Sequence, residues 1–591
     1  MNKQVVIPRN EYPRPIFRRR NWLCLNGEWD FAYDYGRSGE DRGMVANGEY
    51  PLKITVPFCP ESKLSGIRNT DFIPAVWYRK TVDFDKLPQS RVLLHFGAVD
   101  YYAKVWVNGI FVGEHKGGYA AFYLDVTDAL CQGENTIVVY AEDDVRSGCQ
   151  PYGKQSSQFK SSGCYYTRTT GIYQTVWLEF VPTRYLVNSK NTPHACDGYL
   201  DLQVKATNPL IGDFVRVKAY YKGKKVGEAN AAFVGNIANA RLRVDELHLW
   251  DVGKPEIYDL TIELADQDGQ TIDSVDSYFA MRDVSFTNKS LTINGKPIFM
   301  RLILDQGFNP DGIYTAPNVE YLRQDILLAM QLGFNGARFH QRIFEPYSLY
   351  YADILGYIVW VEMPISSSHL ENLDVMENYL PEWMDIVESH YNYPCVVGWV
   401  PLNETYHRMK MNTYSHKLFY TITKQMDCYR PVIDASGGVH YQTDMFDTHD
   451  YEQNPEIFKS HYQKMLEDEN AFYSAAAIYR GRAPARDETY AGQAYWVSEY
   501  GGTFWDSLHK NGDGGWGCGY VKNEQEFATR YTELTDVMLS HPRICGFCYT
   551  QLTDIEQEQN GLYYYDRTEK FSKEIYEKVR QINLKQAEIE K

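Results

Sequence analysis

The sequence predicts a multidomain protein with a β-sandwich of the jelly-roll type, then an immunoglobulin-like β-sandwich, then a C-terminal (β/α)8 TIM barrel. Two observations carry this prediction. At 591 residues the chain is too long for a single hydrophobic core. Short strand-like segments fill its first half, whereas strands and helices alternate in its second half. We therefore expect domains at residues 1–182, 183–284 and 285–591.

Residues 1–182 have the pattern of an all-β domain. Asn108-Gly109 stands between two strand-like runs, and this dipeptide is the strongest short-range signal for a hairpin. The segments NTIVVYAED and QTVWLEFV continue the series of short strands, and no convincing helix interrupts it. This pattern favours a jelly roll.

Residues 183–284 again have strands but little else. Polar and apolar residues alternate in YLDLQVKATN, FVRVKAYYKG and YDLTIELAD. About 100 residues with this alternation predict a small immunoglobulin-like sandwich.

From residue 285 onward the pattern changes to strand then helix. The candidate strands are IFMRLILDQ, GARFH, YIVWVEM, VVGWVPLNE, PVIDAS, FDTHDY, AYWVSEY and ICGFCYTQL. The clearest helix is NVEYLRQDILLAMQLG, which carries one apolar stripe and a stop at Gly333. Eight strands in this length predict a barrel. A doubly wound sheet is the alternative, but LILDQGFNPDG is not the glycine-rich phosphate loop that it needs.

Charge and hydropathy exclude several classes of partner. The formal net charge of −17 argues against a nucleic-acid-binding protein, which needs clustered cations. No window reaches about 18 uninterrupted apolar residues, and the first residues contain no apolar leader core. We expect no membrane segment and a cytoplasmic location, and a homo-oligomer stays open.

The cysteines and histidines predict no metal and no cofactor. Eleven cysteines without the spacing of a disulfide scaffold suit a reducing compartment. The one Cys-x-x-Cys, at Cys545 and Cys548, lies in an apolar run and is expected to be part of a buried strand. The spacing of the histidines fits no metal motif.

Polar residues end most of the expected barrel strands. Glu404 ends the fourth strand and Glu499 the seventh. In a barrel of this kind the active site lies where the strands end at their C-terminal face. The other polar residues at these ends are Asp305, His340, Glu362, His449 and Tyr451.

Two carboxylates that face each other across such a site suit glycoside hydrolysis. One stays protonated and gives a proton to the leaving oxygen, while the other is ionised and attacks the sugar carbon. The 48 Tyr and 12 Trp residues fit ordinary β-structure first, and they also suit stacking on sugar rings. From these residues alone, other carboxylate chemistry on the same barrel stays open.

Several motifs make the expectation more specific. LNGEWDF, VWVNGIFVGEHKGGYAAFYLDVT, RTTGIYQTVWLE, LTINGKPIFM, GFNGARFHQ, VVGWVPLNE and YWVSEYGG occur in that order. With them the chain resembles glycoside hydrolase family 2, the β-galactosidase and β-glucuronidase group, over essentially its whole length. The resemblance implies retaining exo-hydrolysis of a carbohydrate through a covalent glycosyl-enzyme, with Glu404 as acid/base and Glu499 as nucleophile. It also implies that Asn403 holds the sugar 2-hydroxyl and that Asp305, His340 and Tyr451 line the pocket, and we add Glu362 to the substrate-binding set.

Departures from the family pattern bear on the substrate. Thr550 and Gln551 stand where the family usually has a tryptophan as a floor for the sugar. Trp516 or Trp505 in the loop after Glu499 replaces this floor, or these residues form a packed loop core.

The electrostatic pattern predicts a neutral sugar. Glu558 and Asn560 stand where glucuronidases resembling this family have Asn-x-Lys for the sugar carboxylate, and Arg567 is expected to pair with Asp566. We therefore expect a β-galactoside, with a galactofuranoside or arabinofuranoside as the alternative. A non-catalytic glycan-binding barrel is the alternative from another class, and such a protein should have lost one of the two glutamates.

Overall fold

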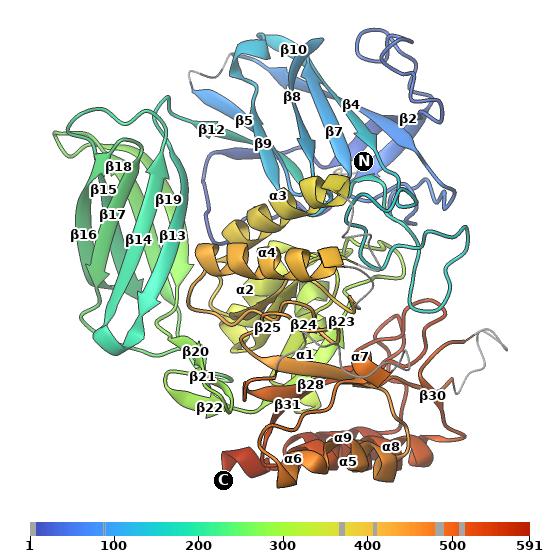
Figure 1. Ribbon diagram of the computed structural model, residues 1–591. Coiled ribbons are helices and arrows are strands. Elements are labelled where there is room, and N and C mark those ends of the chain that lie inside the picture. Colours follow the sequence, from blue (N-terminus) through green and yellow to red (C-terminus); the bar gives the residue numbers. More distant parts are fainter. Residues whose placement is uncertain are drawn as a thin grey trace.

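The computed structural model describes residues 7–86, 88, 90–365, 373–405, 410–478, 490–506 and 515–591 (Figure 1). Two β-rich parts lie against a parallel sheet that is covered by helices. Within the described residues, no helix combines the length and apolar character needed to cross a membrane.

The first part consists of two antiparallel sheets with a shared core. Its strands are β1 (Trp22–Cys24), β2 (Gly27–Tyr33), β3 (Leu52–Val56), β4 (Ala75–Phe84), β5 (Arg91–Phe96), β6 (Val99–Asp100), β7 (Tyr102–Val107), β8 (Ile110–Lys116), β9 (Phe122–Asp125), β10 (Gly133–Glu142), β11 (Gly171–Ile172) and β12 (Val176–Val181). The sheet orders are β1-β12-β5-β9 and β3-β2-β4-β10-β7-β8, and β6 pairs with β11. Asn108 (φ 52°) and Gly109 (φ 79°) make the expected turn between β7 and β8, because both adopt the left-handed conformation of a type I′ hairpin.

The second part is a sandwich built around one long strand. Its strands are β13 (Leu186–His194), β14 (Tyr199–Ala206), β15 (Phe214–Tyr221), β16 (Lys224–Val234), β17 (Ile237–Arg243), β18 (Tyr258–Ala265) and β19 (Thr271–Phe279). β16 pairs with β15 over most of its length and with β17 only through its last residues, so it passes from one layer to the other. Figure 1 shows this sandwich in green, beside the barrel. A small sheet, β20 (Val284–Phe286), β21 (Leu291–Ile293) and β22 (Lys296–Ile298), leads to the barrel.

The third part is a curled parallel sheet with the order β26-β25-β24-β23-β31-β28-β27. Its strands are β23 (Met300–Asp305), β24 (Gly336–Phe339), β25 (Ile358–Glu362), β26 (Val396–Val400), β27 (Phe446–Asp450), β28 (Tyr495–Gly501) and β31 (Ile544–Thr550). All seven are completely buried except at Arg301 on β23, which accounts for the near-continuous apolar sequences of most of them. The exception is β27 (FDTHD), which buries two aspartates and a histidine that are hydrogen-bonded. Cys545 and Cys548 lie on β31 as free, buried thiols, as their apolar run predicts.

One of the eight expected barrel strands is irregular. Residues 431–436 (PVIDAS) are not a regular strand, which corrects the sequence prediction. On the side toward β26, this segment pairs with the neighbouring chain only through two isolated parallel bridges, Trp399–Val432 and Asn403–Ser436. On the other side the Ser436 hydroxyl and the Gly437 amide both bind the Asp447 carboxylate, so a side chain replaces the backbone ladder there. The barrel closes through these contacts.

Helices surround the barrel, most of them on its outside, whereas the short α7 (Ala475–Ile478) lies at its mouth, where Ala475 and Ala476 line a cavity. They are α1 (Val319–Gln331), α2 (Pro346–Leu355), α3 (Leu373–His390), α4 (Lys410–Met426), α5 (Pro455–Tyr462), α6 (Lys464–Glu467), α7 (Ala475–Ile478), α8 (Glu524–Leu539) and α9 (Lys573–Asn583), and a short parallel pair is formed by β29 (Thr503–Phe504) and β30 (Gly519–Tyr520). The predicted helix α1 is present: the Asn318 side chain caps it by accepting from Tyr321 N, and Gly333 (φ 84°) follows its end.

A segment of the first part, residues 143–170, lies on the barrel. Gly153 N donates to Pro364 O at 3.0 Å, and Thr167 N donates to Glu556 at 3.0 Å. On α3, Glu382 accepts a hydrogen bond from Tyr119 N at 2.6 Å. These contacts bring side chains of the jelly roll to the mouth of the barrel, which is where a barrel site is expected.

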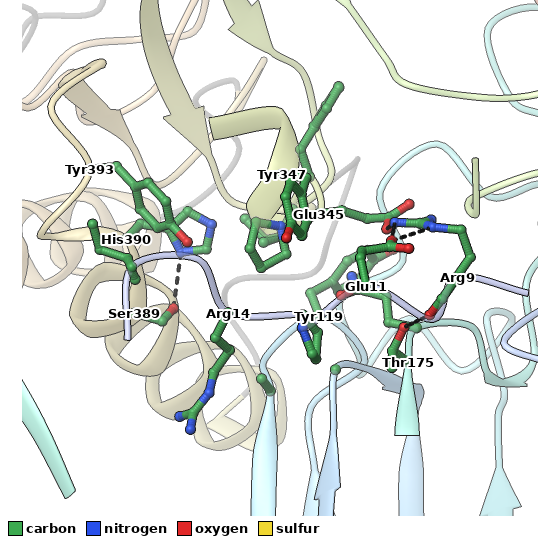
Figure 2. Close-up of a pocket in the computed structure, with 18 of the residues that line it drawn as sticks. Arg9, Glu11, Arg14, Tyr119, Thr175, Glu345, Tyr347, Ser389, His390 and Tyr393 are labelled. Carbon is green, nitrogen blue, oxygen red and sulfur yellow. Dashed lines mark hydrogen bonds and ion pairs between the residues drawn. The ribbon is translucent and has the colours of Figure 1, made fainter. Parts of the chain in front are cut away.

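A second, smaller cavity lies where the N-terminal segment, the jelly roll, α2 and α3 meet (Figure 2). It is not a second candidate active site. Arg9 lies there between Glu11 and Glu345, with ion-pair distances of 2.7 and 2.6 Å. The cavity measures about 100 Å³, against about 250 Å³ at the barrel mouth. The charged groups Arg9, Glu11 and Glu345 pair with one another and so hold the adjoining segments together.

Candidate active site

The cavity at the C-terminal ends of the barrel strands brings together residues that are far apart in the sequence. It encloses about 250 Å³. The described residues that line it are Lys154, Cys164, Leu304, Gln306, His340, Glu404, Gly437, His449, Tyr451, Ala475, Ala476, Glu499, Trp516, Cys518, Thr550 and Glu558. Both glutamates named from the sequence are among them.

Both carboxylate oxygens of Glu499 accept hydrogen bonds. Arg338 donates to Oε1 at 2.9 Å, and the Tyr451 hydroxyl donates to Oε2 at 2.6 Å. Arg338 is buried, and although burial opposes its charge, Glu362 and Glu499 together raise its pKa. A carboxylate that is fixed in this way suits nucleophilic attack.

Glu404 lies beyond the end of β26 in a strained conformation. Its φ is 48°, which is unusual for a residue with a side chain, and its amide donates to Ser436 O at 2.8 Å. Strain of this kind concentrates at functional sites. The side chain keeps 38% of its surface exposed, so it faces the open part of the cavity.

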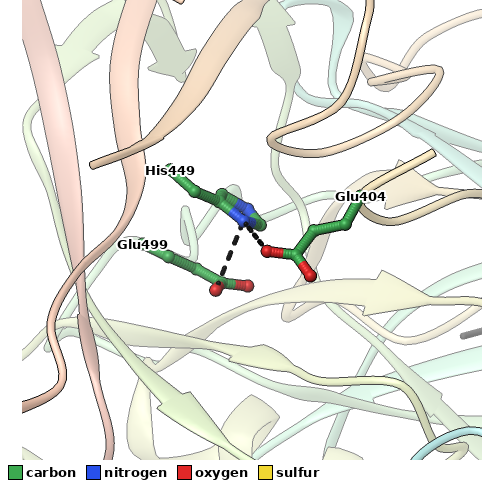
Figure 3. Close-up of side chains that lie close together, drawn as sticks. All are labelled: Glu404, His449 and Glu499. Carbon is green, nitrogen blue, oxygen red and sulfur yellow. Dashed lines mark hydrogen bonds and ion pairs between the residues drawn. The ribbon is translucent and has the colours of Figure 1, made fainter. Parts of the chain in front are cut away.

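His449 stands between the two carboxylates (Figure 3). Its Nδ1 lies 2.9 Å from Glu404 Oε1 and 3.3 Å from Glu499 Oε2. Burial opposes the charged imidazole, but both glutamates raise the pKa of His449 above its usual value. Burial also opposes the charge on Glu404, yet the hydrogen bond and the charge of His449 lower the pKa of Glu404 to about 2.

The carboxylates are close enough to act on one carbon atom. One oxygen of Glu404, one oxygen of Glu499 and a ring nitrogen of His449 all lie within 4.8 Å of one another. This donor set also suits a first-row divalent metal, which the histidine spacing did not suggest. Since Arg338 and Tyr451 already occupy both oxygens of Glu499, the arrangement fits a carboxylate pair better than a metal centre.

Three predicted site residues do not line the cavity. Glu362 has a fully buried side chain, and its oxygens bind Arg338 at 2.5 Å and His340 at 2.8 Å. It therefore orients these two residues from behind instead of binding substrate, which corrects the expectation. Asp305 also lies outside the lining, where its Oδ1 accepts from Gly307 N at 2.8 Å.

Asn403 is the third residue outside the cavity lining, but it differs in having a free donor. Its Oδ1 accepts from Arg338 at 3.0 Å, and its buried amide nitrogen has no hydrogen-bond partner among the described residues. A buried donor of this kind needs an acceptor, and a sugar hydroxyl can supply one.

The two tryptophans after the nucleophile strand have different surroundings. Trp505 stacks on Phe571 with ring centroids 4.8 Å apart, so it belongs to a packed core. Trp516 lines the cavity, and its backbone pairs with the segment that carries Glu558. Of the two tryptophans, Trp516 is therefore the one that is open to a ligand in the cavity.

Sequence reasoning missed Arg338 and Lys154. Arg338 had a signal, because it lies two residues before His340 on the expected strand and alternate residues share one face. Lys154 had none, because it comes from a loop of the jelly roll whose position on the barrel is set by tertiary contacts.

Comparisons with known proteins agree with this architecture. Residues 34–178 match the family described as "Glycosyl hydrolases family 2, sugar binding domain", residues 191–282 match "Glycosyl hydrolases family 2", and residues 284–502 match "Glycosyl hydrolases family 2, TIM barrel domain".

Individual relatives are distant. A putative β-glucuronidase of Formosa agariphila is 25% identical over 68% of this chain and 48% of its own length, and a β-galactosidase of Pectobacterium atrosepticum is 25% identical over 74% of this chain and 44% of its own length. The chain thus spans about half the length of these curated relatives. The solved structure of a Lactobacillus rhamnosus β-glucuronidase has the same fold, with a TM-score of 0.80, 18% identity and coverage of 98% of this chain and 99% of that one.

Proposed function

The chain belongs to glycoside hydrolase family 2, and on this premise we propose that it is an exo-acting glycosidase that retains anomeric configuration. The single observation that carries the proposal is the carboxylate pair, with oxygens of Glu404 and Glu499 within 4.8 Å. Retaining glycosidases have carboxyl groups about 5–5.5 Å apart, whereas inverting enzymes leave about 6.5–9.5 Å for a water molecule. A cavity closed on one side by jelly-roll residues supports action on a terminal sugar.

Glu499 is the nucleophile in this proposal. It attacks the anomeric carbon and forms a glycosyl ester, and the hydrogen bonds from Arg338 and Tyr451 hold its carboxylate in position beforehand. The free amide nitrogen of Asn403 is available to donate to the sugar 2-hydroxyl, a contact that strengthens in the transition state of these reactions.

Glu404 and His449 act together as the proton donor. In the free site the proton lies on His449, because the pKa of Glu404 is low and that of His449 is raised. The two groups share one proton across 2.9 Å and titrate as a unit. His449 passes this proton to Glu404, which gives it to the leaving oxygen, so that the pair is left without a proton and Glu404 is ionised. In the second step Glu404 takes a proton from the water that releases the sugar.

The two glutamates should respond differently to azide. In Glu404→Ala, an aryl glycoside with a good leaving group still forms the glycosyl-enzyme, and azide then gives a glycosyl azide with the configuration of the substrate. In Glu499→Ala, azide replaces the nucleophile and gives the opposite anomer. The products are identified by NMR, and the same anomer from both variants would refute the roles.

The sugar is a separate question. The relatives are named for glucuronides and galactosides, and our sequence prediction favoured a neutral β-galactoside. Two of its electrostatic premises change in the structure. Glu362 shares the positive charge of Arg338 with Glu499, so it adds less negative charge to the site than a free carboxylate would. Arg567, expected beside Asp566, forms a two-bond ion pair with Asp325, but another cation, Lys154, lines the cavity.

A further inference from the structure

We propose that Lys154 is a specificity residue that binds the carboxylate of an acidic terminal sugar, so that the preferred substrate is a uronic acid glycoside. The inference rests on the proposed function and goes beyond it by naming the substrate class. It depends on the position of Lys154, on the partners of its ammonium group, and on the hydrogen bonds and protonation of the nearby Glu558.

The backbone of Lys154 is fixed in place on the barrel. Lys154 O accepts from Tyr166 N at 2.8 Å, and the preceding Gly153 N donates to Pro364 O at 3.0 Å. A side chain at position 153 would collide with Gln341 O, so the loop approaches the barrel as closely as backbone permits. The lysine is therefore pre-positioned at the cavity before any ligand binds.

The ammonium group of Lys154 is buried without a carboxylate partner. The residue is 7% exposed. Among the described parts of the chain no ion pair includes it, and its hydrogen-bond partner is the Cys164 thiol, with Nζ 3.7 Å from Sγ. A thiol is a weak acceptor, whereas an ammonium group has three donors. Buried lysines are ordinarily paired, so this one is built to receive an anion.

Several nearby groups, the catalytic carboxylates among them, keep the lysine charged. Burial opposes its charge, but Cys164, Tyr165 and the more distant Glu404 and Glu499 raise its pKa. The proposed chemistry removes part of this compensation, because Glu499 becomes a neutral ester and Glu404 carries the proton for the leaving group. A carboxylate on the sugar compensates Lys154 through these steps, whereas a neutral hydroxyl does not.

Glu558, which would repel an acidic sugar, is itself satisfied by other groups. The Tyr166 hydroxyl donates to one of its oxygens, and Asn560 Nδ2 donates to the other at 2.8 Å. Burial raises the pKa of Glu558 to about 7. Its negative charge is therefore partly compensated by hydrogen-bond donors and is reduced near neutral pH. Lys154 is then the charged group that distinguishes an acidic sugar from a neutral one.

The test uses substrates that differ only at C6. kcat/KM is measured for the p-nitrophenyl β-glucuronide and β-glucoside, and for the β-galacturonide and β-galactoside. We expect one uronide to exceed its neutral partner by about 100-fold or more. In Lys154→Met the uronide value should fall by about 100-fold, mainly through KM, and the neutral value by less than about 10-fold. Lys160→Met, an exposed lysine of the same loop, is the matched control and should leave both values unchanged.

The outcomes separate the inference from the proposed function. If the neutral glycosides are the better substrates, or if Lys154→Met lowers both members of a pair equally, the lysine only balances the catalytic carboxylates and the inference is overturned, while the glycosidase assignment stands. Hydrolysis of none of the four aryl glycosides would count against the proposed function.

A binding measurement on the wild-type protein tests whether the site prefers an acidic sugar, and it requires neither catalysis nor a variant. Titration of the wild-type protein with free glucuronate, galacturonate, glucose and galactose should show one uronate binding at least about 10-fold more tightly than its neutral partner. Equal or weaker binding of both uronates would overturn the inference even if Lys154→Met failed to fold.

Discussion

In the proposed reaction the proton for the leaving group is held by two residues, His449 and Glu404. Protonated His449 places its Nε2 3.1 Å from the Ser436 hydroxyl, which in turn donates to Asp447 at 2.6 Å. This chain ends on a carboxylate, so it favours the charged imidazole. The raised pKa of His449 then sets the pH above which the pair loses its proton.

Replacing His449 should move the alkaline limb of activity to lower pH. In His449→Asn the proton donor is Glu404 alone, a carboxyl group that loses its proton at lower pH than the pair does. The limb of kcat/KM for a p-nitrophenyl glycoside should therefore shift down by about one pH unit or more. A dinitrophenyl glycoside, whose leaving group needs no proton, is the control and should show no shift. An unchanged limb with the first substrate would contradict the shared proton.

The residues that could be predicted are those whose own strand carries them to the site. Glu404 and Glu499 follow apolar strands, and the strand order of a barrel brings such ends together. Lys154 could not be predicted in this way, because its loop reaches the site through contacts with residues such as Pro364. Glu362 was misassigned because a strand end does not tell whether a side chain faces the cavity or the layer behind it.

Among the elements, the segment of residues 143–170 and the irregular segment 431–436 matter most. The sequence of the latter, PVIDAS, is apolar enough for a strand, but on the side toward β27 the Ser436 hydroxyl and the Gly437 amide bind the Asp447 carboxylate in place of a backbone ladder. No local pattern reveals that competition. The regular barrel strands other than β27, by contrast, were predictable because each is a largely apolar run of ordinary strand length.

Removing the hydroxyl of Tyr166 should loosen the jelly-roll segment and disturb the site. This hydroxyl donates to Glu558 and accepts from Gln306 Nε2 at 2.9 Å. Tyr166→Phe leaves a buried carboxylate with one donor fewer, so the free energy of unfolding should fall by about 1–3 kcal/mol, with a lower kcat/KM. Tyr102→Phe removes a similar bond to Glu114 at an exposed site and should change stability by less than about 1 kcal/mol. Equal effects in thermal unfolding would show that Glu558 does not depend on Tyr166.

At the scale of the whole molecule, the jelly roll is joined to the barrel through buried acids. Glu382 on α3 is 1% exposed; burial raises its pKa to about 8, with hydrogen bonds from Tyr119 and Ala120 opposing the shift. The folded protein therefore holds a proton that the unfolded chain releases near pH 4.5. This contribution to stability is complete below about pH 4.5 and is lost as the pH rises toward about 8.

Glu382→Gln should remove this pH dependence. The amide keeps an acceptor for Tyr119 N and never ionises, so the variant should gain stability relative to the wild type by roughly 2–4 kcal/mol between pH 5 and pH 8. Other buried acids titrate in both proteins and cancel in the difference. Chemical unfolding at several pH values gives this difference directly. A constant difference across the range would mean that Glu382 is ionised in the folded protein.

The central claim is that Glu499 forms a covalent bond to the sugar. The 2-deoxy-2-fluoro glycosyl fluoride of the preferred sugar forms this ester but hydrolyses it slowly, so the adduct accumulates and can be located by mass spectrometry of the digested protein. We expect one sugar per chain, attached to the peptide that contains Glu499, and no adduct in Glu499→Gln. An adduct on another residue, or no adduct in an enzyme whose first product has inverted configuration, would contradict it.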